Sequence, residues 1–133
     1  ISPRSYQQMQ LPVEKVLADR LRPYGIHHCG DNMHRIAAAY AELEPAFCDV
    51  GWGSDVAACR RALPDTFLNL RLSPIRMLQC TPKEMAADAE SLLLAAGPLD
   101  NVGLCCINMD YGTPDDNLFA VGEVVARYRN YGA

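Results

Sequence analysis

Short apolar runs alternate with longer amphipathic stretches along the chain. The first amphipathic stretch places Val13, Val16, Leu17 and Leu21 on one side of a helix, with Pro12 in its first turn. We predict that this side faces the core. The remaining helices are predicted over residues 33–43, 54–63, 74–78, 81–96 and 113–128.

The short apolar runs that separate these helices are typical of buried strands. They cover residues 26–29, 46–50, 66–70 and 101–107. Thr81, Pro82 and Glu84 form a strong helix start after the third strand, because the threonine can cap the helix and the acid follows three residues later. Strands that alternate with helices predict an α/β fold with a parallel sheet. Four strand–helix units form either a small open sheet or half of a (β/α)8 barrel, and the pattern alone does not choose.

Composition fits one globular domain, which we assign to residues 1–133. Half of the 133 residues are apolar and 21% are charged, so a core can form. A net charge of −4 argues against a nucleic-acid partner, which needs clustered Lys and Arg. No apolar run approaches the roughly 20 residues that span a bilayer, so we expect no membrane segment. The opening residues Ile1-Ser2-Pro3-Arg4 lead us to expect a fragment of a longer chain.

Six cysteines are many for a chain of this size. Their spacing is irregular, and several lie in apolar strand-like runs, where a reduced thiol packs as a small apolar residue. We therefore expect reduced thiols in a cytoplasmic protein.

Histidine and cysteine gather at predicted strand ends, where functional groups of parallel α/β folds lie. His27 and Cys29 are two residues apart and point to the same face of their strand, whereas His28 points toward the helices. Imidazole and thiolate are preferred zinc ligands. Cys105 and Cys106 end the last strand and face opposite sides; we choose Cys106 as the third ligand because it lies nearer the strand's end. The alternative is that these residues only pack in the interior.

Four motifs of the chain carry a resemblance to a known family. They are His27-His28-Cys29-Gly30, Ser2-Pro3 through Leu11-Pro12, Leu72-Ser73-Pro74 followed by Thr81-Pro82-Lys83-Glu84, and Thr113-Pro114-Asp115-Asp116-Asn117. These motifs resemble those of the cobalamin-dependent methyltransferases in the uroporphyrinogen decarboxylase superfamily, and the first of them is similar to the His-x-Cys-Gly motif of these enzymes. The resemblance implies that the chain is the C-terminal half of a (β/α)8 barrel.

The resemblance also implies a metal and a reaction. It carries zinc ligands onto His27, Cys29 and Cys106, the trio chosen from strand geometry. It implies transfer of a methyl group between methylcobalamin on a corrinoid partner protein and a thiol such as coenzyme M, with tetrahydrofolate as a variant. The sequence departs from the superfamily at Arg71 and Ser73, which stand where Asn and Asp are usual.

Other polar residues near strand ends are candidates for substrate binding. They are Asp49, Trp52, Asn69 and Arg71, and each has the alternative of an ordinary loop or lumen contact. Two further functions stay open. The first is a uroporphyrinogen decarboxylase-like enzyme, which the sequence Cys105-Cys106-Ile107-Asn108 disfavours. The second is a non-catalytic, zinc-stabilised assembly module, since a half-barrel needs an N-terminal half-barrel or a second copy to cover its strand edges.

Overall fold

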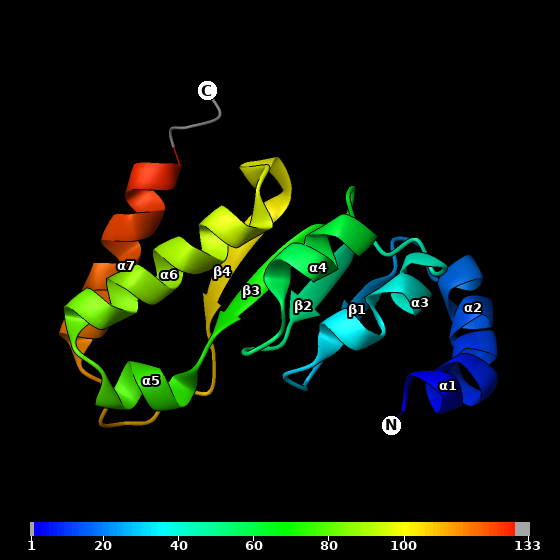
Figure 1. Ribbon diagram of the computed structural model, residues 1–133, viewed down its shortest axis with the longest axis horizontal. Helices are drawn as coiled ribbons and strands as arrows, with labels where there is room; N and C mark the ends of the chain where they lie inside the picture. Colours follow the sequence, from blue (N-terminus) through cyan, green and yellow to red (C-terminus); the bar gives the residue numbers. More distant parts are fainter. Residues whose placement is uncertain (1, 130–133) are drawn as a thin grey trace.

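Four parallel strands form one sheet in the computed structural model, which describes residues 2–129. The strands are β1 (Gly25–His27), β2 (Phe47–Val50), β3 (Phe67–Leu72) and β4 (Val102–Cys106). They lie in the order of the chain, β1-β2-β3-β4, and every neighbouring pair is parallel (Figure 1). The sequence prediction of an α/β fold with half-barrel topology is confirmed.

Helices connect the strands and flank the two ends of the sheet. They are α1 (Pro3–Ser5), η1 (Tyr6–Gln10), α2 (Leu11–Arg20), η2 (Met33–Arg35), α3 (Ala37–Ala41), α4 (Val56–Ala62), α5 (Pro74–Gln79), α6 (Pro82–Ala96), η3 (Leu99–Asn101) and α7 (Asp115–Tyr128). Figure 1 shows α3, α4 and α6 lying along one side of the sheet, with α2 at the β1 end and α7 at the β4 end. Each strand–helix unit therefore adds its strand beside the previous one, and its helix covers the same face of the sheet.

The two faces of the sheet differ in chemistry because successive strand residues point to opposite sides. On the face toward the helices, Cys48, Leu68 and Leu70 are completely buried. The opposite face carries His27, Asp49, Asn69 and Arg71, and we call it the site face. Phe47 and Phe67 lie on the site face at the start of their strands, stacked with ring centroids 5.8 Å apart and still partly exposed.

The strongest predicted helix start is confirmed. The Thr81 hydroxyl accepts from the Glu84 backbone N–H, and the Glu84 carboxylate accepts from the Thr81 backbone N–H, which forms a capping box. The helix predicted over residues 54–63 begins at Val56 and ends at Ala62, with Asp55 as its cap. The Asp55 carboxylate accepts from the Ala58 backbone N–H. The Ser54 hydroxyl instead accepts from the Met33 backbone N–H, so it links the segment after β2 to the segment after β1.

The predicted buried side of the first helix is wrong. Val13, Val16, Leu17 and Leu21 are 44–60% exposed, and the helix packs instead through Leu11 and Ala18. The helix does form at the predicted place, but it lies at the β1 end of the sheet. An apolar stripe is therefore left without cover in residues 2–129.

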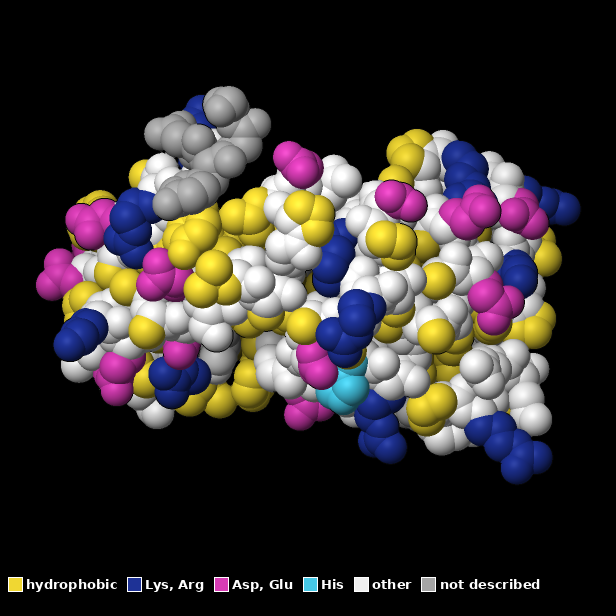
Figure 2. Space-filling model, turned by 45° about the horizontal axis from the view of Figure 1, so that its top comes forward, with side chains coloured by type: hydrophobic (Ala, Val, Ile, Leu, Met, Phe, Trp, Pro, Cys, Tyr) yellow, Lys and Arg dark blue, Asp and Glu magenta, His cyan; other side chains and the backbone are white. Residues whose placement is uncertain are grey.

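Charged groups of both signs are spread over the visible surface in Figure 2, with apolar patches between them. Within the described residues, no helix is long and apolar enough to cross a bilayer.

Candidate functional site

The strand register aligns three polar side chains in one row across the site face. His27 of β1 lies opposite Asp49 of β2, and Asp49 lies opposite Asn69 of β3. Gly103 of β4 completes the row, and an added Cβ there would come within 3.2 Å of the Asn69 side-chain oxygen. Residues far apart in sequence thus meet because parallel strands keep the same register.

Hydrogen bonds link the side chains of this row. The Asn69 amide donates to Asp49 Oδ1 at 2.6 Å, and His27 Nδ1 lies 2.8 Å from Asp49 Oδ2. The hydrogen bond with Asp49, followed by one with Cys29, raises the pKa of His27. Burial opposes the charged form of Asp49, but the hydrogen bonds from His27 and Asn69 outweigh it and lower the pKa of that carboxyl. Asp49 is therefore a carboxylate that holds an imidazole.

Arg71 places a buried cation beside this row. It is 5% exposed, and its Nη1 donates to the His28 carbonyl at 3.2 Å and lies 3.5 Å from His27 Nε2. Its Nε is buried and has no hydrogen-bond partner in residues 2–129. The positive charge of this buried side chain therefore lies beside the exposed His27 ring.

Cys29 follows β1 and is exposed. A hydrogen bond with His27 and then one with Arg71 lower the pKa of its thiol. Thiolate is the form of cysteine that binds metals and attacks electrophiles. Sulfur and nitrogen donors of the predicted His-x-Cys pair thus lie next to each other at the carboxyl end of β1.

The backbone at Gly51 lies very close to the turn that carries Cys29. A Cβ at Gly51 would lie 1.6 Å from the Gly30 carbonyl oxygen and 2.9 Å from the His28 carbonyl oxygen. Only glycine fits there, because any side chain would overlap with backbone. The backbone at Gly51 therefore packs directly against the turn that carries Cys29. The next residue, Trp52, is 40% exposed in its loop.

The structure does not bring Cys106 to His27 and Cys29. Cys106 pairs with Leu72 and packs with Leu72 and Met77 against the helices, and burial raises the pKa of its thiol. Cys105 lies opposite Arg71, so strand alternation puts Cys105 on the site face. The sequence prediction favoured Cys106 because it lies nearer the end of the strand. The register of β3 with β4 instead places Cys105 on the site face.

The donor set fits zinc in part. His27 and Cys29 supply one nitrogen and one sulfur at a common point, which suits two positions of a tetrahedral site. Within residues 2–129, no group of three or more His, Cys, Asp and Glu side chains stands close enough to hold one metal ion. A third protein ligand would have to approach from elsewhere, and the end of β4 offers two thiols.

Sequence reasoning named most of the clustered residues without their contacts. Of the residues predicted as substrate contacts, Asp49 and Arg71 lie beside His27, and Asn69 lies beside Asp49. Trp52 lies outside the hydrogen-bonded row. The pairing of His27 with Asp49 was missed. The available signal was that both residues lie near the carboxyl ends of consecutive strands. His28 points toward the helices as predicted, where its Nδ1 lies 3.0 Å from the Tyr40 hydroxyl.

Comparison with known proteins gives a likeness of fold. No family model matches the chain, and no curated protein sequence is significantly similar to it. Among solved structures, a methyltransferase from Methanosarcina mazei matches with a TM-score of 0.69 at 18% sequence identity. The match covers 97% of this chain and 38% of that one, so the chain spans well under half the length of the methyltransferase. The likeness shows that the α/β half-barrel arrangement occurs in a known enzyme.

Proposed function

We propose that this chain is the zinc-binding part of a cytoplasmic methyltransferase of the cobalamin-dependent type. In this proposal, a methyl group moves between methylcobalamin on a corrinoid partner protein and a thiol such as coenzyme M, or tetrahydrofolate. The observation that carries it is the contact of His27 with Cys29 at the carboxyl end of β1, beside the buried Arg71. The fold likeness to a methyltransferase supports it.

His27 and Cys29 would hold the zinc, with a third thiolate from the end of β4. Cys106 is the ligand predicted from sequence, and Cys105 is the cysteine that shares the site face. Zinc, when bound, supplies a cation that keeps an incoming thiol in its nucleophilic thiolate form at neutral pH.

The other residues of the site face would prepare the pocket. Asp49 holds His27, and Asn69 holds Asp49 through the 2.6 Å hydrogen bond. Arg71 places a positive charge next to a site that gathers thiolates, which offsets their mutual repulsion. In this proposal Trp52 stays a candidate contact for the corrin ring.

Thiol methylation provides the functional test. The chain, loaded with zinc, is mixed with methylcobalamin and coenzyme M, and loss of methylcobalamin is followed by its absorbance. We expect a rate above that of zinc and thiol alone, and we expect Cys29→Ser to abolish the increase while Cys80→Ser, which lies at the end of α5, retains it. Equal rates for wild type and Cys29→Ser would contradict the proposal.

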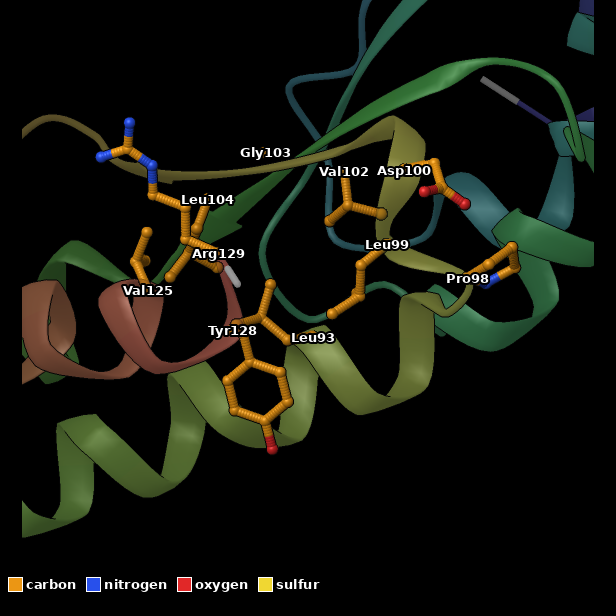
Figure 3. A pocket seen from close by; sticks show the side chains of 10 residues that line it. All are labelled: Leu93, Pro98, Leu99, Asp100, Val102, Gly103, Leu104, Val125, Tyr128 and Arg129. Atoms are coloured by element: carbon orange, nitrogen blue, oxygen red, sulfur yellow. The ribbon is translucent and has the colours of Figure 1, made fainter. Parts of the chain in front are cut away.

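Uncovered apolar surface favours a second candidate function, an assembly module. The stripe on α2 lies at one end of the sheet, and a pocket of about 780 Å³ lies at the other. Figure 3 shows Val102, Gly103 and Leu104 of β4 facing this pocket together with Leu93 of α6 and Tyr128 of α7. An uncovered strand edge beside apolar side chains is a surface that proteins normally pair or cover. We propose that an N-terminal half-barrel or a second copy covers both ends.

Assembly predicts a mass above that of one chain. In light scattering coupled to gel filtration, we expect the chain alone to elute at a multiple of 14.6 kDa. Leu17→Lys, in the exposed stripe of α2, should shift the population toward the monomer, whereas Arg20→Glu, at an exposed position of the same helix, should not. A wild-type monomer at all concentrations would contradict self-assembly.

A further inference from the structure

We propose that the chain binds the carboxylate of a small organic acid in a second cavity, which includes no side chain of the site face. The cavity has a volume of about 440 Å³ and lies between the segment before α1 and the connection from β1 to α3. The side chains that line it and carry the argument are Ser2, Pro3, His28, Asn32, Arg35 and Ile36. This inference involves no metal and does not depend on the proposed methyl transfer.

Arg35 supplies a positive charge at the cavity. Its side chain is exposed and forms no ion pair within residues 2–129. Among the same residues, no Asp or Glu lines the cavity. Asp31, the acid nearest to Arg35 in the sequence, lies against Gly53 instead. The guanidinium is therefore available to a ligand, and its planar fork matches a carboxylate.

A turn places Asn32 beside Arg35 at the cavity wall. The Arg35 backbone N–H donates to the Asn32 carbonyl at 3.0 Å, at the start of η2. The Asn32 side chain does not cap η2, so its amide group is left to face the cavity that it lines. An amide and a guanidinium from one turn thus offer N–H donors to the two oxygens of a carboxylate.

His28 adds a buried nitrogen without a hydrogen bond. Its Nδ1 lies 3.0 Å from the Tyr40 hydroxyl, and a phenol that donates to Nδ1 leaves the ring proton on Nε2. Nε2 is buried and has no hydrogen-bond partner in residues 2–129, since the Asn32 side chain lies beside it without the geometry of a regular bond. A buried donor of this kind destabilises the fold until a ligand or a water accepts from it.

The absent side chain of Gly30 leaves space in front of this nitrogen. A Cβ at Gly30 would lie 3.0 Å from His28 Nε2 and 3.4 Å from the side-chain oxygen of Asn32. A ligand oxygen in this space would accept from His28. Pro3 and Ile36 form an apolar part of the wall, which suits the hydrocarbon part of the acid. One guanidinium balances one negative charge, so we expect a carboxylate to bind better than the more highly charged inorganic phosphate.

Nuclear magnetic resonance of the metal-free chain, titrated with butyrate, tests the cavity. The His28 Nε2 signal in the long-range proton–nitrogen spectrum, assigned with His28→Gln, should shift and saturate with a Kd on the order of 1 mM. Butyramide, which has a similar shape without the charge, should bind about 10-fold less tightly, and so should inorganic phosphate. Phosphate that binds as tightly as butyrate would overturn the assignment of a carboxylate. A signal that butyrate leaves unchanged would overturn the site.

Two variants test the cavity by different routes. Arg35→Gln removes the charge and Gly30→Ala fills the space before His28, and we expect each to weaken butyrate binding about 10-fold or more. Arg61→Gln is the matched control, because Arg61 is an exposed arginine of α4 outside the lining and its loss should leave the affinity unchanged. Amide spectra like that of the wild type verify that each variant is folded. Wild-type affinity in either Arg35→Gln or Gly30→Ala would overturn the inference.

Discussion

Replacing Arg60 with leucine is expected to lower the free energy of unfolding by about 3–5 kcal/mol, since hydrogen bonds to a charged group contribute about 1.5–3 kcal/mol each and several are lost together. Arg60 lies on α4 and is 6% exposed. Its guanidinium donates to backbone carbonyls of five residues, which are Leu63, Pro64, Thr66, Ala96 and Asn101.

These carbonyls belong to segments that must meet for the sheet to form. They lie after α4, before β3, at the end of α6 and before β4. Leucine fills similar space but leaves the carbonyls without donors in a buried place, which adds the cost of burying unpaired polar groups. Arg60 thus works as a clamp at the amino ends of β3 and β4, opposite the end that carries the site.

Urea unfolding followed by circular dichroism measures the effect, with Arg61→Leu as the control. Arg61 is the next residue of the same helix and is exposed, so its replacement should change stability by no more than about 0.5 kcal/mol. Arg60→Lys keeps the charge without the planar fork and should fall between the two. Equal midpoints for Arg60→Leu and Arg61→Leu would show that the clamp does not stabilise the fold.

Replacing Cys29 with alanine is expected to remove the bound zinc. The proposed site has one nitrogen from His27, the last residue of β1, and one sulfur from Cys29, which follows β1. A zinc ion that loses one of three protein ligands is bound much less tightly. Metal analysis after dialysis should find one zinc per chain in the wild type and substoichiometric zinc in Cys29→Ala.

The adjacent cysteines at the end of β4 form a matched pair for the third ligand. Cys105→Ala removes a thiol from the site face, and Cys106→Ala removes one that packs with the helices. Zinc lost only in Cys105→Ala would assign the ligand by register, and zinc lost only in Cys106→Ala would show that the end of β4 turns over when the metal binds. Stoichiometric zinc in Cys29→Ala and in both β4 variants would contradict the site altogether.

The fold was largely predictable because its signals are local. Apolar runs marked the four strands, and the Thr81–Glu84 capping box marked the start of the longest helix. Alternation along a strand also separated His27 from His28 correctly. These features depend on residues within a few positions of each other, which the sequence displays directly.

Features that depend on neighbours across the sheet were harder to predict. Periodicity located α2 but could not tell that Val13 and Leu17 would lie uncovered, because coverage depends on what packs beyond β1. The choice between Cys105 and Cys106 depends on the register of β3 with β4, which leaves no mark in local sequence. The His27–Asp49 hydrogen bond likewise results from the alignment of two strands.

X-ray absorption at the zinc edge tests the central claim most directly, because it reports the atoms around the metal. For the zinc-loaded chain, we predict a four-coordinate site with two sulfurs at about 2.3 Å and an imidazole nitrogen at about 2.0–2.1 Å. A shell of oxygen and nitrogen without sulfur would contradict a site built on Cys29 and His27.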